Sequence, residues 1–73
     1  LVALMLVSGD LVSIPQGSYV KTIDKKIGIS MPRQIKTKKY GVVVNNGVGD
    51  NYRVLITDVI YEIDKKFLQL VAE

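Results

Sequence analysis

The stretch that decides the fold is YRVLITDVIYEID, which covers residues 52–64. Apolar and polar residues alternate through both halves of it, which is the period of a half-buried β-strand. Thr57 and Asp58 separate the halves and predict a two-residue hairpin loop, although neither is the glycine that such loops favour. One face of the first strand is predicted to carry Tyr52, Val54 and Ile56, and the inward face of the second Val59, Tyr61 and Ile63.

Upstream, YGVVVNN (residues 40–46) predicts a strand. Its three consecutive valines are typical of a strand that is covered on both faces or that lies at the bend of a barrel. NNGVGDN (residues 45–51) is a turn cluster, and Gly47 and Gly49 are both able to adopt a positive φ there.

Further upstream, Val12 and Ile14 alternate with Ser13, the pattern of another half-buried strand. Pro15 has no backbone donor, so it should end this strand or lie on an edge, and Gly17 follows as a break. Downstream, residues 65–67 predict one helical turn before a short closing strand around residues 68–71. The apolar residues 1–7 are expected to form an N-terminal strand or arm.

Together these segments predict an all-β fold in one domain that covers residues 1–73. We expect a small antiparallel barrel of five or six strands, with a long first loop and one short helical turn before the last strand. Closure of the sheet would remove edges that a chain rich in valine and isoleucine cannot leave open safely.

The positive charge of the protein is concentrated in residues 21–39. This segment holds seven basic residues and one acid, a net charge of +6, whereas the rest holds three bases and six acids, a net charge of −3. Pro32 and the spread isoleucines give no helical period, so the segment is expected to be a long basic loop or an irregular hairpin that packs some isoleucines on the core. Candidate partner-binding or nucleic-acid-binding residues are Lys21, Lys25, Lys26, Arg33, Lys36, Lys38, Lys39 and Tyr40.

Three interpretations of this basic segment stay open. Clustered lysines can neutralise phosphates, and six lysines with one arginine suit attraction to a nucleic-acid backbone more than base recognition. The same charges can dock a protein partner, or can simply keep an aggregation-prone barrel soluble. The four tyrosines (Tyr19, Tyr40, Tyr52 and Tyr61) are expected to pack at the rim, the alternative being an aromatic cage for a cation.

Catalytic and metal-binding residue patterns are missing from the sequence. The chain contains no histidine and no cysteine, so its serines have no obvious base, and the usual zinc ligands are absent. Asp58, Glu62 and Asp64 are close in sequence, but outward carboxylates on a strand are ordinarily solvated. We expect no enzymatic activity, no metal, no cofactor and no small-molecule substrate. The seven-residue apolar start is too short to span a bilayer and lacks signal-peptide features, so a cytoplasmic or virion-associated protein is expected, without membrane attachment.

The order GDLVSI, a long excursion, YGVVV, the hairpin YRVLITDVIYEI and finally LQLV resembles an SH3-like small β-barrel over residues 8–71. Within that class the chain is similar to small phage-encoded SH3-like proteins at Gly9, Asp10, residues 40–44, residues 52–56 and Ile63. A weaker resemblance, through Gly9, Asp10, Val12, Gly17 and residues 41–43, is to KOW-type barrels, which bring together the two halves that residues 18–40 separate here.

These resemblances imply a non-enzymatic interaction or structural module of phage or viral origin. A protein partner or self-association, with residues 1–7 pairing with a second copy, is the first expectation for its function. The alternative is a nucleic-acid-binding module that uses the basic segment from Lys21 to Lys39.

Overall fold

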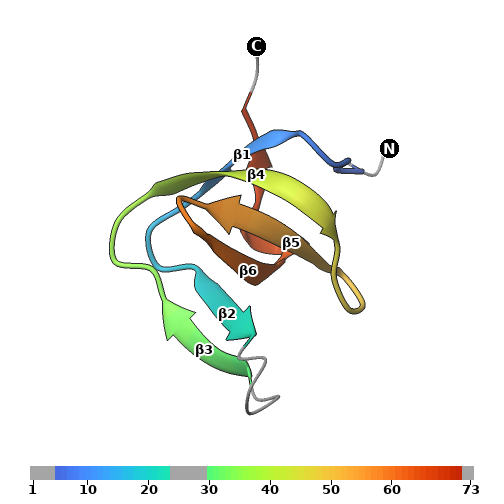
Figure 1. The fold of residues 1–73 in the computed structure, drawn as a ribbon. Coiled ribbons are helices and arrows are strands. Elements are labelled where there is room, and N and C mark those ends of the chain that lie inside the picture. Colours follow the sequence, from blue (N-terminus) through green and yellow to red (C-terminus); the bar gives the residue numbers. More distant parts are fainter. Residues whose placement is uncertain (1–4, 24–29, 72–73) are drawn as a thin grey trace.

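The computed structural model describes residues 5–23 and 30–71, and its described part is built from β-strands (Figure 1). The prediction of an all-β fold is confirmed, and no α-helix occurs among these residues. In chain order the elements are β1 (Leu11–Ile14), β2 (Tyr19–Ile23), β3 (Ser30–Gln34), β4 (Lys39–Asn46), β5 (Asn51–Ile56), β6 (Val59–Asp64), the 3-10 turn η1 (Lys65–Phe67) and β7 (Gln69–Leu70).

Among the described residues the sheet has seven strands where five or six were predicted, because the basic segment supplies more regular structure than a loop. β2 and β3 pair antiparallel, from Tyr19 opposite Gln34 to Ile23 opposite Ser30. The expectation of a long loop over residues 21–39 is therefore wrong for these strands, and the hairpin alternative is correct. Pro32 is tolerated within β3 because this strand lies at the edge of the sheet, where a missing donor costs no ladder bond.

All strands belong to one antiparallel sheet with the order β3-β2-β6-β5-β4-β1-β7. The predicted closure into a barrel is not observed: among the described residues the strand pairing ends at β3 on one side and at β7 on the other. Both edges are nevertheless poor templates for another strand. β3 carries Pro32 and Arg33, and β7 is only two residues long. Proline, charge and short length each discourage edge-to-edge pairing.

The turn after β1 leads to β2, which lies beyond β4, β5 and β6 in the strand order of the sheet. Pro15 follows directly after Ile14, as predicted, and the Ser18 N–H donates to the Pro15 carbonyl at 3.2 Å. Gly17, the third residue of this turn, has a φ of +90°, and Gly9 in the turn before β1 has a φ of +97°. Both positions favour glycine because its missing Cβ permits the left-handed conformation.

The hydrophobic core lies on the inner face of the curled sheet. Ser13 was expected to alternate outward from Val12 and Ile14, yet it is buried. The reason is that β1 is an interior strand, with Ser13 opposite Tyr40 of β4 on one side and Gln69 of β7 on the other. The buried apolar residues are Leu6, Val12, Ile14, Val20, Val43, Val54, Ile63 and Leu68.

The three valines of β4 mark a bend and not a doubly covered strand. Val42 is exposed and Val43 is buried, while the register with β5 shifts between Val43 and Asn45, which leaves Val44 as a β-bulge residue. A bulge of this kind bends its strand and increases the local twist. In the following loop Gly49 has a positive φ of +62° and Gly47 does not, so only one of the two glycines is required for backbone conformation.

The β5–β6 hairpin forms as predicted around Thr57 and Asp58, with Ile56 opposite Val59. Val54 and Ile63 are fully buried, which confirms the alternation in the middle of both strands. Val59 is instead 42% exposed, because it lies next to the hairpin loop, at the end of the strands.

The C-terminal prediction is confirmed, and the N-terminal arm is partly described. Asp64 caps the 3-10 turn by accepting a hydrogen bond from the Lys66 N–H at 3.0 Å, and β7 then pairs with β1. Residues 5–7 form no strand, but Leu6 is buried in the core and its N–H donates to the Tyr52 hydroxyl at 3.4 Å. None of the helical structure in the described ranges is long and apolar enough to cross a membrane.

Candidate binding groove

The strands distribute the predicted basic residues over different sides of the sheet. Lys21 lies on β2, Arg33 on β3 and Lys39 at the start of β4, and Lys36 and Lys38 lie in the connection between β3 and β4. Lys25 and Lys26, also predicted as binding residues, lie outside the described residues. Side chains alternate along a strand, so neighbouring bases in the sequence point to different surfaces.

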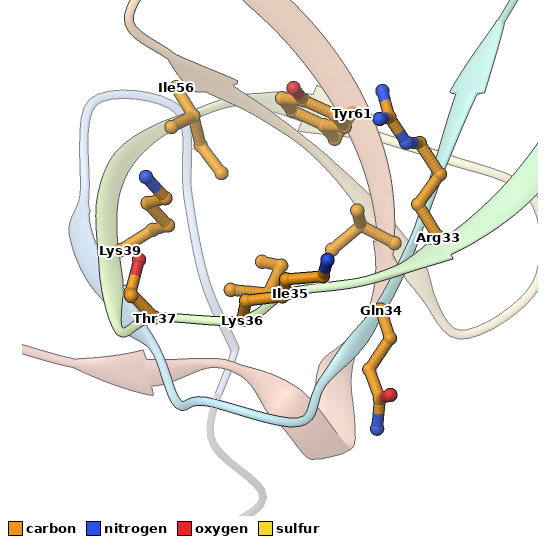
Figure 2. A pocket seen from close by; sticks show the side chains of 9 residues that line it. Arg33, Gln34, Ile35, Lys36, Thr37, Lys39, Ile56 and Tyr61 are labelled. Atoms are coloured by element: carbon orange, nitrogen blue, oxygen red, sulfur yellow. The ribbon is translucent and has the colours of Figure 1, made fainter.

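Three of these bases surround one groove, which has a volume of about 370 Å³ (Figure 2). Arg33 lies at one end beside Tyr61, and Lys39 lies at the other end beside Thr37. Ile35 lies between the two ends. In the described part of the chain, the groove is lined by Val20, Arg33, Gln34, Ile35, Lys36, Thr37, Lys39, Ile56 and Tyr61.

Backbone hydrogen bonds hold the connection between β3 and β4 against the turn after β1. The Gly17 N–H donates to the Ile35 carbonyl at 2.8 Å, and the Ile35 N–H donates to the Ser18 carbonyl at 2.8 Å. The side chain of Ile35 packs against the hydrophobic core. Lys36 and Thr37 therefore follow an anchored residue, and their positions at the groove depend on the tertiary fold.

The apolar wall of the groove comes from the inner face of the sheet. Ile56 and Tyr61 are half-buried and pack against the core, and Val20 is buried. Tyr61 stands opposite Thr22 of β2 and Val54 of β5, so strand pairing on both sides holds its backbone in place. The groove thus combines a fixed aromatic and aliphatic wall with charged side chains at its rim.

The charged side chains of the groove are all positive. Arg33, Lys36 and Lys39 contribute three positive charges, and none of the nine lining residues is acidic. Their neighbours Thr37 and Gln34 add side chains that can form hydrogen bonds, although Gln34 points away from the centre and donates to the Gly17 carbonyl at 3.3 Å. Such a lining suits an anion, because its charge would meet cations and no competing carboxylate.

The remaining predicted residues lie elsewhere. The Lys38 ammonium lies 5.3 Å from the centre of the Tyr40 ring, and neither residue lines the groove. Lys21 lines a second, smaller pocket of about 220 Å³, in which Glu62 and Asp64 oppose its charge. The structure therefore separates Lys21, Lys38 and Tyr40 from the three bases that converge.

The four tyrosines have four different environments. Tyr19 contacts Phe67, with ring centroids 6.4 Å apart, while Tyr40 lies beside Lys38 and Tyr61 lines the groove. The Tyr52 hydroxyl accepts the Leu6 N–H. These contacts match the expected rim packing better than an aromatic cage, which needs several rings around one point.

Sequence reasoning missed the uncharged half of the groove. Alternation along β6 correctly predicted an inward Tyr61, but the sequence contains no signal that this ring would meet residues 33–39. Ile35 was covered only by the general expectation that some isoleucines pack on the core. The missing information is the β2–β6 pairing, which joins segments about forty residues apart in the chain.

Two of the three acidic residues that were weighed as catalytic or metal-binding candidates, Glu62 and Asp64, have structural partners. Glu62 accepts a hydrogen bond from the Asn51 side-chain amide at 2.9 Å and lies 3.9 Å from the Arg53 guanidinium, and Asp64 caps the 3-10 turn. Within the described ranges, no group of three or more metal-ligating side chains could hold an ion.

No family model matches the chain, and neither the curated proteins nor the solved structures contain a significant match.

Proposed function

We propose that this protein is a non-enzymatic binding module that binds the backbone of single-stranded nucleic acid in the basic groove. The observation that carries the proposal is the convergence of Arg33, Lys36 and Lys39 on one groove that has no acidic residue in its lining within residues 5–23 and 30–71. The three bases lie within residues 33–39, on β3, in the connection and on β4, and the fold brings them together with Tyr61 of β6 in one groove.

The charge of the groove supports an anionic ligand. Lysine and arginine side chains that neutralise phosphates release condensed counterions, and this release favours binding at low salt. Two of the three cations are lysines, which act as flexible point charges and suit a phosphate backbone better than the edge of a particular base. Sequence-independent binding is therefore expected.

The apolar wall supports a single strand over a duplex. Proteins that bind single strands combine a positive groove with aromatic side chains on which bases stack. Tyr61 supplies one ring, and Ile35 and Ile56 supply aliphatic surface beside it. A phosphate can contact the cationic rim while an unstacked base packs on this wall. A duplex keeps its bases stacked and would leave the wall uncovered.

The strand order supports an SH3-like architecture as part of this proposal. A hairpin excursion follows β1, the tight β5–β6 hairpin follows a longer loop, and a 3-10 turn precedes the last short strand. The expected phage or viral origin stays a prediction, and gene neighbours that encode capsid, tail or replication proteins would support it. A protein-docking function also stays a prediction, and the groove favours it less because a purely acidic peptide segment has no apolar group to cover the aromatic wall.

The proposal is tested with a charge-matched pair of triple variants. The groove variant is Arg33→Gln, Lys36→Gln and Lys39→Gln, and the control is Lys21→Gln, Lys65→Gln and Lys66→Gln, which removes the same charge from residues outside the groove. Binding of a fluorescein-labelled oligo-dT of about 20 nucleotides is measured by anisotropy between about 50 and 200 mM salt. Three phosphate contacts predict a slope of log K against log salt of about −2 for wild type.

The groove variant is expected to lose most of this slope, whereas the control variant is expected to retain it. Absence of wild-type binding at about 50 mM salt would refute the proposal. Equal losses in the two triple variants would also refute it, because they would indicate attraction by net charge alone. Poly-glutamate is measured in parallel. Tighter binding to it than to oligo-dT would indicate that the ligand is an acidic protein segment and not nucleic acid.

A further inference from the structure

A row of exposed aliphatic side chains crosses four strands on the outer face of the sheet. Leu11 of β1 stands opposite Val42 of β4, Val42 opposite Leu55 of β5, and Leu55 opposite Ile60 of β6. Residues directly opposite in register lie on the same face, so these four form one continuous row, called here the outer apolar row. Their exposed fractions are between 38% and 46%.

The outer apolar row departs from the usual pattern of an antiparallel sheet. One face of such a sheet packs on the core and the other is normally polar where it meets water. Here the inner neighbours Val12, Val43 and Val54 are already buried, so the row is additional to the core. Neighbouring strands lie about 4.8 Å apart, so the three intervals between the four strands make the row about 14 Å long. Contiguous exposed apolar patches are often functional, which makes the row a candidate interaction site.

We infer that a second copy of this chain covers the outer apolar row, forming a weak symmetric dimer. A two-fold axis that passes between β4 and β5 and runs parallel to these strands places Val42 over Leu55 of the second copy. The same operation places Leu11 over Ile60 of that copy. Each residue of the row therefore meets another apolar residue of the same row, as a self-complementary interface requires.

The charges beside the row are compatible with a second copy. Arg53 and Glu62 lie two residues further along β5 and β6 on the same face, 3.9 Å apart, and they neutralise one another. The two-fold axis places Arg53 over Asn45 of the other copy, so the two guanidinium groups do not oppose each other. The cations of the groove border the inner face, where the core-packed Tyr61 and Ile56 lie, and they do not enter the contact.

The small size of the row indicates a weak, transient dimer. Stable interfaces bury about 800 Å² on each partner, and a strip four residues long, with its flanks, buries less than that. The dimer should therefore be populated near about 1 mM protein and largely dissociated near about 20 µM. This inference goes beyond the proposed function, since it concerns the opposite face of the sheet and makes no use of nucleic acid.

The test compares Leu55→Lys, within the row, with Val48→Lys as the matched control. Val48 is 73% exposed in the β4–β5 loop and receives the same new charge away from the row. Sedimentation equilibrium between about 20 µM and 1 mM should show the average mass of wild type and of Val48→Lys rising toward twice the monomer value. Leu55→Lys should remain monomeric over that range.

Amide chemical shifts recorded on wild type over the same concentrations give an independent readout that requires no variant. They should move at Leu11, Val42, Leu55 and Ile60 and stay constant at Arg33, Lys36 and Lys39, the groove cations, which are not adjacent to the row in the chain. A wild-type protein that is monomeric at about 1 mM overturns the inference. So does a dimer that persists in Leu55→Lys, equal loss in the control, or concentration-dependent shifts confined to other residues such as those of the N-terminal arm.

Discussion

Replacing Gly41 with alanine is expected to destabilise the fold strongly, although the backbone at this position would accept an L-residue. Gly41 is buried on β4, opposite Val12 of β1, and it has no positive φ. An added Cβ would lie 2.6 Å from Cγ1 of Val54, 2.8 Å from the backbone oxygen of Leu55 and 2.9 Å from Cγ1 of Ile56. Carbon atoms pack favourably only at about 3.5–4.0 Å, so the strands must shift.

The magnitude follows from how little these neighbours can move. Val54 is completely buried, and the oxygen of Leu55 belongs to a strand that pairs on both sides. Overpacking of a tight core costs about 1–3 kcal/mol, and a backbone contact places Gly41→Ala in the upper part, at about 2–3 kcal/mol. Alanine also lowers the conformational entropy of the unfolded chain, which stabilises the fold by about 0.4–1 kcal/mol. The free energy of unfolding should therefore fall by about 1–2.5 kcal/mol, which lowers Tm by about 5–20 °C.

Gly47→Ala is the matched control, since it is the same substitution at another glycine without a positive φ. A Cβ at Gly47 would meet only side-chain atoms of Glu62, the nearest at 3.0 Å. A side chain can shift by a few tenths of an ångström more readily than a paired backbone, so the expected change is within about 1 kcal/mol.

Urea unfolding followed by circular dichroism measures both variants, with thermal melts as a second readout. At an m-value of about 1–2 kcal/mol/M, the midpoint of Gly41→Ala should fall by about 1 M. A Gly41→Ala protein as stable as wild type would refute the steric reasoning. So would a Gly47→Ala protein that loses as much stability, because the distinction between backbone and side-chain neighbours would then have no effect.

Two further substitutions test the turns. Thr57 has a φ of +58°, which is a strained value for a β-branched residue. Thr57→Gly should therefore raise the free energy of unfolding by about 0.5–1 kcal/mol, after the entropy that glycine adds to the unfolded chain is subtracted. A lower Tm would contradict this. Ser18 is buried and its Oγ donates to the Pro15 carbonyl at 2.6 Å, so Ser18→Ala should lose about 1 kcal/mol in urea unfolding. An unchanged midpoint would indicate that the backbone bond from the Ser18 N–H alone holds the turn.

Local pattern was sufficient to predict most of the strands. The alternation around Val54 and Ile63 predicted β5 and β6, and the residues between them predicted the tight hairpin. The 3-10 turn before β7 was also predicted correctly. These elements are predictable because side-chain period and turn residues act over a few positions of the chain.

The prediction was weaker wherever a neighbouring strand decided the outcome. Ser13 alternates as an outward residue, but it is buried in β1, which lies between β4 and β7 in the sheet. The hairpin formed by β2 and β3 was only an alternative to a loop, because Pro32 argues against a strand unless the strand is known to lie at an edge. Edge position is a property of the whole sheet and not of the five residues of β3.

The sequence by itself determined that the chain is all-β, that its positive charge is concentrated in residues 21–39 and that Tyr61 faces inward. Only the tertiary structure decided that Arg33, Lys36 and Lys39 share a groove with Tyr61, while Lys38 and Lys21 lie elsewhere. It also decided that exposed aliphatic residues from four strands align into one row. The physical reason is register: a shift of one residue between strands moves every side chain to the opposite face, and register depends on contacts between segments far apart in the chain.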